Sequence, residues 1–155
     1  MSHTHHYKAI IEWTGNTGTG TSAYRDYARS HNIRIEGKAG IAGSSDPAFL
    51  GDPASHSPED LFLSSISACH MLWYLHYCAV NGVVVTAYED AAHATMLETA
   101  DGGHFTEVIL HPLVTVEDAS MIEKANALHQ RAHHSCYLAN SCNFPIRHEA
   151  KAVVV

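Results

Sequence analysis

Apolar and polar residues alternate at the start of the chain, and a long segment with almost no charge follows later. Residues 7–13 (YKAIIEW) alternate with a period of two, which predicts a strand with one buried face. Residues 15–21 (GNTGTGT) predict a tight turn rather than a phosphate loop, because neither a Lys-Ser or Lys-Thr pair nor a helix pattern follows the glycines. Residues 22–39 predict two further extended segments, and residues 40–56, rich in Gly, Pro, Ser and Asp, predict an ordered loop.

The clearest helix signal begins at Ser57. This residue can cap the helix, Pro58 suits the first helical position, and two acidic residues follow where the helix dipole favours negative charge. The segment then stays almost free of charge until Asn81-Gly82, a pair typical of a left-handed helix end. The pattern predicts a helix over residues 58–80, about 35 Å long at 1.5 Å per residue.

This helix is apolar on all sides, so it must be covered on all sides. One small sheet from the same chain covers it poorly, and a second copy of the chain is therefore expected. A membrane span is the alternative for twenty near-apolar residues. Polar residues interrupt the segment, however, and neither a basic flank nor an aromatic belt accompanies it, so we expect no membrane insertion.

The second half of the chain predicts strands around a second helix. Residues 83–98 and 104–116 are strand-like and joined by a hairpin, with Pro112 favouring an edge or a bulge. Asp118 can cap a helix over residues 119–138, and a last strand follows within residues 144–155. The predicted order βββ-α-ββ-α-β belongs to the α+β class, with antiparallel pairing favoured by the short connections.

The composition and charge of the chain limit the kinds of binding partner that we expect. The length of 155 residues, with 46% hydrophobic, predicts one domain over residues 1–155 with a proper core. The formal charge of −7 argues against nucleic acid or an anionic membrane as partner, so a small molecule is favoured. The N-terminal MSHTHHYK has no apolar signal core, which predicts a cytoplasmic protein whose four cysteines stay reduced.

The cysteines permit few arrangements. Cys69 and Cys78 are nine positions apart on one helix and face opposite ways, so they can share neither a metal nor a disulfide. His129, His133 and Cys136 are spaced four and then three apart and would project from one side of the second helix as zinc ligands. Fourteen histidines, however, make chance proximity common, and no fourth ligand stands at a diagnostic spacing.

The remaining possibility pairs Cys69 with Cys136 across the two helices. A reactive thiolate needs a cation nearby, and Cys69 lies too deep in its helix for the N-terminal dipole to help. Arginines of residues 24–34 are the natural candidates, because Arg stays charged when buried. Glu59 could hold such an arginine, although it lies about 15 Å from Cys69 along the helix axis.

At these residues the chain resembles the OsmC/Ohr family of thiol-dependent hydroperoxide reductases. SPEDLFLSSISACH (residues 57–70) has the Pro-Glu-x-Leu opening of the family and its Ala-Cys ten residues after the Glu. AHHSC (residues 132–136) resembles the Ala-His-x-x-Cys around the second cysteine, and the order of strands and helices agrees along nearly the whole chain. The resemblance implies an OsmC-like α+β fold with antiparallel sheets packed on a long buried central helix, in an intertwined homodimer.

The resemblance also implies a mechanism. Cys69 would be the peroxidatic cysteine and Cys136 the resolving cysteine of a peroxidase that reduces organic hydroperoxides in oxidative-stress defence. Glu59 would position an arginine, with Arg25 the best match and Arg29 or Arg34 as alternatives. The two active sites would lie at the subunit interface and be recycled by a dithiol, possibly lipoyl, without metal, haem or flavin.

The sequence departs from the family pattern in places, and one rival reading stays open. Tyr137 follows the second cysteine where Pro is often found, His70 stands where an aromatic residue is common, and Cys78 and Cys142 are additional and expected to be structural. The rival is a non-catalytic protein of the same fold that binds a small molecule or a metal through His129, His133 and Cys136.

Overall fold

The computed structural model describes residues 2–154, so Val155, within the last predicted strand, lies outside the described residues. The chain divides into two compact units, Met1–Leu61 and Phe62–Val155. The expectation of one domain over residues 1–155 stays a prediction.

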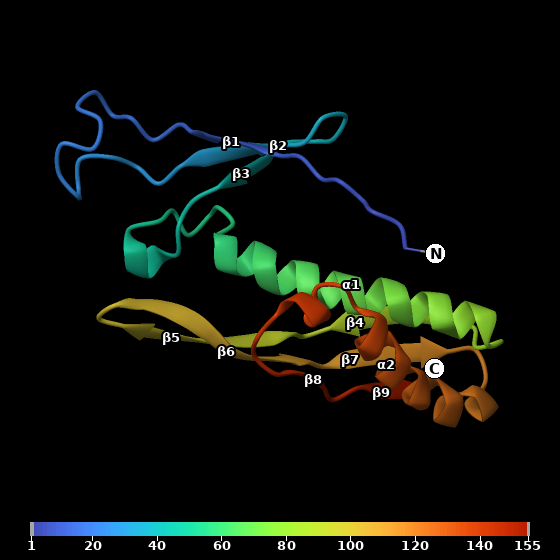
Figure 1. Cartoon of the computed structure of the whole chain (residues 1–155). Coiled ribbons are helices and arrows are strands. Elements are labelled where there is room, and N and C mark those ends of the chain that lie inside the picture. The colour runs from blue at the N-terminus through green and yellow to red at the C-terminus, as the bar shows by residue number, and fades with distance from the viewer. Residues whose placement is uncertain (1, 155) are drawn as a thin grey trace. The chain divides into compact units, whose positions relative to one another are not determined.

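The first unit contains a small antiparallel sheet in the order β1-β2-β3 (Figure 1). Its strands are β1 (Ile10–Trp13), β2 (His31–Arg34) and β3 (Ile41–Gly43). Strand β3 lies where the sequence predicted a loop, and residues 22–39 contain one strand instead of two extended segments. Residues 41–43 form a strand because they pair with β2. In this pairing Ile41 lies opposite Ile33, a contact that local turn composition does not reveal.

The connection between β1 and β2 is longer than a tight turn. An isolated bridge joins Asn16 to Tyr27, and the indole of Trp13 donates a hydrogen bond to the carbonyl of Ala28 at 2.9 Å. A side chain on Gly15 would place its Cβ 1.8 Å from the same carbonyl oxygen. Glycine is therefore required at position 15 because the two backbones approach so closely.

Helix α1 (Pro58–Val80) begins and ends where the sequence predicted. The hydroxyl of Ser57 accepts a hydrogen bond from the backbone N–H of Asp60 at 3.1 Å, and the Asp60 carboxylate accepts one from the N–H of Ser57 at 2.9 Å. This reciprocal pair satisfies two of the free N–H groups at the helix start. At the other end, Gly82 has φ of 72°, the left-handed conformation that closes a helix.

The second unit holds two three-stranded sheets. One has the order β4-β7-β9 and the other β5-β6-β8. Their strands are β4 (Val85–Asp90), β5 (His93–Thr99), β6 (Gly102–Leu110), β7 (Pro112–Val116), β8 (Ile146–His148) and β9 (Lys151–Val153). The β4–β7 and β5–β6 pairs are antiparallel, but β6–β8 and β7–β9 are parallel, so the expectation of antiparallel pairing throughout is wrong.

The strand count and the place of Pro112 also differ from the prediction. The observed order is βββ-α-ββββ-α-ββ, because each of the three strands predicted after the first helix divides into two shorter strands. Pro112 is buried at the first residue of β7, which lies between β4 and β9 and is not an edge strand. Proline is tolerated at the first position of a strand inside a sheet. Pro112 is therefore compatible with a central strand, and the prediction of an edge strand is wrong.

Helix α2 (Ile122–Ser135) is shorter than predicted. A 3-10 turn, η2 (Ala119–Met121), precedes it, and Asp118 caps this turn by accepting from the N–H of Ser120 at 2.8 Å. Cys136 has extended backbone angles, and a second turn, η3 (Ala139–Ser141), follows it. Cys136 therefore lies beyond the helix, so the prediction that it projects from one helical face with His129 and His133 is wrong.

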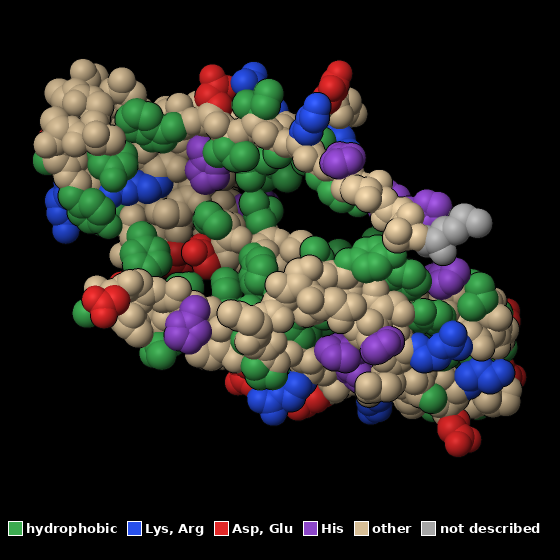
Figure 2. Space-filling view, in the orientation of Figure 1, with side chains coloured by type: hydrophobic (Ala, Val, Ile, Leu, Met, Phe, Trp, Pro, Cys, Tyr) green, Lys and Arg blue, Asp and Glu red, His purple; other side chains and the backbone are tan. Residues whose placement is uncertain are grey.

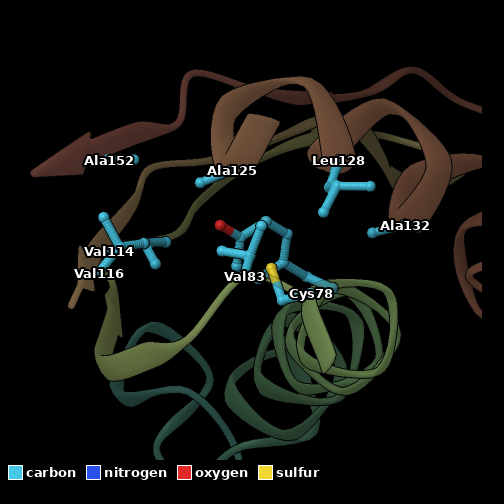
Figure 3. Packing of buried hydrophobic residues seen from close by; sticks show 9 residues of the cluster. Cys78, Val83, Val114, Val116, Ala125, Leu128, Ala132 and Ala152 are labelled. Carbon is cyan, nitrogen blue, oxygen red and sulfur yellow. The ribbon is translucent and has the colours of Figure 1, made fainter. Parts of the chain in front are cut away.

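The main core of the second unit lies between α1, α2 and the β4-β7-β9 sheet. Figure 3 shows Cys78 of α1 facing Val114 and Val116 of β7, with α2 above them. The alanines and the leucine of α2 close this cluster, which also includes Ala152 of β9. A smaller cluster forms around Ile66, Val108, Leu110 and Ile146. Burial of such side chains contributes about 1.5–3 kcal/mol each, which holds α1 against α2 and the sheet.

Helix α1 is buried along one stripe only. The stripe consists of Ile66, His70, Tyr74 and Cys78, whereas Leu72 and Val80 are each 62% exposed. Within residues 2–154, no helix combines the length and the apolar character that crossing a bilayer demands.

Candidate active site

Cys69 and Cys136 lie together, as the resemblance implies. Cys69 is on α1 and partly exposed, while Cys136 follows α2 and is only 1% exposed. The two thiol groups are within hydrogen-bonding reach of each other. An accessible sulfur is thus backed by a buried one, the arrangement needed when one thiol meets a substrate and the other attacks the product on sulfur.

The surroundings keep Cys136 protonated. Burial, reinforced by the hydrogen bond with Cys69, raises the pKa of its thiol to about 11, although the backbone N–H of Ala139 opposes the shift. At neutral pH the Cys136 S–H group is therefore a donor toward the sulfur of Cys69.

The other two cysteines occupy different environments. Cys78 is buried in the main core beside Tyr74, and burial raises the pKa of its thiol. The thiol of Cys142 donates to the carbonyl of Leu138 at 3.2 Å, and burial raises its pKa as well. All four cysteines are free thiols. Cys69 lies beside Cys136 and Cys78 beside Tyr74, and the conclusion that Cys69 and Cys78 cannot share a partner stays a prediction.

Glu59 lies in the first turn of α1, half-buried. One of its carboxylate oxygens, Oε2, is buried without a hydrogen-bond partner. Because α1 is continuous, Glu59 and Cys69 remain about 15 Å apart along the axis and do not touch. A buried carboxylate oxygen without a donor costs free energy, so this site is incomplete as it stands.

The three candidate arginines differ sharply. Arg25 is exposed, and among residues 2–154 it forms no ion pair. Arg34 pairs with Glu12 at 3.2 Å. Arg29 lies over the rings of Tyr24 and Tyr27, at 4.5 and 4.1 Å from their centroids, and donates to the carbonyls of the same two residues. Only Arg25 is free to take a new carboxylate partner without breaking an existing contact.

Aromatic side chains border the cysteine pair, and sequence reasoning assigned them no site. Trp73, one turn after Cys69, meets Tyr137, the residue after Cys136, edge to face at 5.5 Å between centroids. Trp73 also stacks on Tyr77 at 5.7 Å. Tyr137 stands where the family often has proline, and this departure was the one signal that could have pointed to it.

The three predicted zinc ligands have different partners. His129 bonds to His70, and Cys136 lies beside Cys69. The rings of His129 and His133 each lie 5.8 Å from that of His148, measured between centroids. Figure 2 shows histidine side chains, in purple, grouped where α2 and β8 lie in Figure 1. Across residues 2–154, no three His, Cys, Asp or Glu side chains are arranged to hold a metal ion. The rival ligand set of His129, His133 and Cys136 therefore has no geometric support.

Comparison with known proteins decides the family. The family model described as "OsmC-like protein" matches residues 51–151, which include the opening of α1 and both cysteines of the pair. The chain belongs to the OsmC-like family. No curated protein sequence matches it.

Solved OsmC-like structures share the fold over the whole length. An OsmC-like protein of unknown function from Vibrio cholerae is 27% identical, with a TM-score of 0.84 over 95% of this chain and 99% of that one. The organic hydroperoxide resistance protein OsmC from Legionella pneumophila is 17% identical, with a TM-score of 0.70 over 99% and 100%. An organic hydroperoxide resistance protein from Elizabethkingia anophelis is 15% identical, with a TM-score of 0.69 over 100% of both. The mixed α+β OsmC-like fold is thus confirmed.

Proposed function

We propose that the protein is a cysteine-based peroxidase that reduces organic hydroperoxides and serves in oxidative-stress defence in the cytoplasm. The observation that carries the proposal is the pairing of a partly exposed Cys69 with a buried, protonated Cys136 in an OsmC-like chain. Two structural neighbours named organic hydroperoxide resistance proteins support the substrate class.

The proposed reaction has three steps. The thiolate of Cys69 attacks one oxygen of the O–O bond, sulfur loses two electrons and becomes a sulfenic acid, and the other oxygen leaves as an alkoxide that takes up a proton to give the alcohol. The sulfur of Cys136 then attacks the sulfenic sulfur, the S–O bond breaks, and hydroxide leaves as water once protonated. A dithiol, possibly lipoyl, returns two electrons and two protons by thiol–disulfide exchange. No metal, haem or flavin takes part.

Glu59 and Arg25 complete the proposed site. The unpartnered Oε2 of Glu59 is where a guanidinium would bind, and Arg25 is exposed and unpaired among residues 2–154. Such a pair would hold a positive charge for the Cys69 thiolate. We expect Arg25→Ala to lower the second-order rate with peroxide about tenfold or more, whereas Arg34→Ala, which breaks only the bond to Glu12, leaves that rate within about twofold.

A second copy of the chain would cover apolar side chains that are exposed in a single copy. In β1, Ile10, Ile11 and Trp13 are 60%, 64% and 45% exposed, and Leu72 on α1 is 62% exposed. Apolar side chains exposed in such numbers are typical of an interface. We therefore propose a homodimer with the active site at the subunit interface, and sedimentation at micromolar concentration is expected to give twice the mass of one chain.

The decisive assay couples cumene hydroperoxide consumption to a dithiol. The wild type is expected to turn over, Cys69→Ser to lose activity at least about 100-fold, and Cys136→Ser to consume one equivalent and stop. Cys78→Ser is the matched control, since it changes a cysteine on the same helix outside the pair. Full activity in Cys69→Ser would overturn the proposal.

A further inference from the structure

A buried hydrogen bond joins the two helices next to Cys69. His70, the following residue on α1, bonds through Nε2 to Nδ1 of His129 on α2 at 3.0 Å. Both side chains are almost fully enclosed, at 1% and 0% exposure. Polar side chains this deeply buried are rare unless they bond to a partner.

A second cross-helix bond lies next to Cys136. The residue before it, Ser135, shares a hydrogen bond of 2.7 Å with the hydroxyl of Tyr77 on α1. Each cysteine of the pair is thus the immediate neighbour of a residue that ties α1 to α2. We call His70, His129, Tyr77 and Ser135 the helix clamp.

The geometry of the histidine pair is that of a direct imidazole–imidazole bond. The planes of the two rings differ by 6°, and the ring centroids are 5.3 Å apart. This centroid distance is about the 3.0 Å between the bonded nitrogens plus the distance from centroid to nitrogen in each ring. The two nitrogens therefore point at each other. Nitrogens that share one zinc ion each lie about 2.0–2.1 Å from the metal, and their lone pairs converge on it instead. The pair is a link between helices and not half of a metal site.

The pair is neutral at physiological pH. Burial, reinforced by His148 and His133, lowers the pKa of His70 to about 4, and burial together with His70 and His148 lowers that of His129 to about 3. The groups that face the pair are His148 from β8, His133 from α2, and Tyr74, whose ring stacks on His129 at 3.8 Å. One ring donates its N–H and the other accepts, so the bond needs no charge.

This link is costly compared with an apolar contact. The outer nitrogens, His70 Nδ1 and His129 Nε2, are buried without partners, and each such group costs about 1–3 kcal/mol. Leucines in their place would avoid that penalty. What leucines cannot supply is direction: the His70–His129 hydrogen bond joins one atom on α1 to one atom on α2, which favours a single register of the two helices.

We propose that the helix clamp positions Cys136 for disulfide formation with Cys69, and that it controls this second step without taking part in the first. The proposal rests on the function proposed above. Among the described residues, the printed hydrogen bonds of these four side chains go to one another across the two helices and not to the sulfur of Cys69 or Cys136, so we treat them as positioning residues. Their effect comes from holding the two sulfurs at reacting distance, because a small misplacement between reacting groups costs orders of magnitude in rate.

The test separates the two steps in a single turnover. Protein is mixed with one equivalent of cumene hydroperoxide, peroxide loss gives the first step, and timed dimedone trapping with intact-mass detection gives the lifetime of the sulfenic acid. In His70→Leu and in His129→Leu we expect the first step to stay within about twofold and disulfide closure to slow about tenfold or more. The dimedone adduct then accumulates, which it does not do in the wild type.

Matched variants separate positioning from general damage. The double variant His70→Gln with His129→Asn keeps amide groups near the two bonded nitrogens and is expected to recover most of the closure rate. His134→Leu changes an exposed histidine on the same helix and is expected to have no effect. Tyr77→Phe, which removes only the partly buried bond, is expected to slow closure about two- to fivefold. Closure at the wild-type rate in folded leucine variants would overturn the proposal.

A second measurement keeps this proposal distinct from the proposed function. Equilibration with oxidised and reduced dithiothreitol gives the effective concentration of Cys69 toward Cys136 without any peroxide. We expect the leucine variants to lower it about tenfold and the amide pair to restore it. A wild type that consumes no peroxide but shows this pattern would reject the peroxidase and retain the clamp, whereas unchanged effective concentrations would reject the clamp alone.

Discussion

Two cysteines on α1 lie in contrasting environments, one in a packed core and one partly exposed beside a second thiol. Cys78 lies in the main core beside Tyr74, surrounded by valines, alanines and a leucine. Cys69, two and a half turns earlier, is partly exposed and backed by Cys136. The difference follows from the 100° step of a helix, which puts positions nine apart on opposite sides. Residue type alone therefore says little about a cysteine, while its face on the helix decides its environment.

The contrast predicts a large difference in reactivity. Alkylation of the native protein by iodoacetamide at pH 8 is expected to modify Cys69 at least about 100-fold faster than Cys78, because Cys78 is both buried and held protonated. Peptide mapping over a time course measures both rates. Equal rates, or faster labelling of Cys78, would mean that the two faces do not differ as described.

Acid is expected to destabilise the fold through the buried histidine pair. The pKa values of His70 and His129 are lowered in the folded chain, so the unfolded chain binds more protons below its ordinary histidine pKa of about 6.5. The contribution of the pair is therefore complete above about pH 6.5 and is lost as pH falls toward about 4, by on the order of 3 kcal/mol for each histidine. Thermal unfolding in steps from pH 7.5 to pH 4 measures the loss.

Two substitutions check the origin of this loss. The double variant His70→Leu with His129→Leu should remove most of the dependence between pH 6.5 and pH 4, since among these buried imidazoles only His148 keeps a pKa that burial lowers. The exposed His134→Leu should leave it unchanged. An undiminished slope in the double variant would assign the acid sensitivity to other groups.

The smallest effect is expected from replacing the core cysteine. Cys78→Ser puts a hydroxyl into an apolar cluster and should lower the free energy of unfolding by about 1–3 kcal/mol. Cys69→Ser, at a partly exposed position, should change it by less than about 0.5 kcal/mol. Urea titration of both variants gives the two values, and a larger loss for Cys69→Ser would reverse the comparison.

Sequence reasoning succeeded where the signal is local. The Ser57–Asp60 cap and the Gly82 end define α1 through contacts within a few residues, so its bounds were predictable. Strand β3 and the parallel partners of β6 and β7 depend on segments distant in sequence, and local composition does not encode them.

The features of the candidate site were also predictable only where they depend on local sequence. The opposite facing of Cys69 and Cys78 follows from helical geometry, while the pairing of Cys69 with Cys136 came from the family motifs. The His70–His129 bond spans 59 positions and arises only when α1 packs on α2. Spacing along α2 grouped His129 with His133 and Cys136 instead, because a helical wheel ignores both the neighbouring helix and the early end of α2 at Ser135.

One measurement tests the central claim most directly. The reduced protein is treated with one equivalent of cumene hydroperoxide, blocked with an alkylating reagent, digested and analysed by mass spectrometry. The account predicts a loss of two hydrogens and a disulfide-linked peptide pair that contains Cys69 and Cys136, with Cys78 alkylated only after denaturation. A protein that stays fully reduced, or a disulfide that links Cys69 to another cysteine, would contradict it.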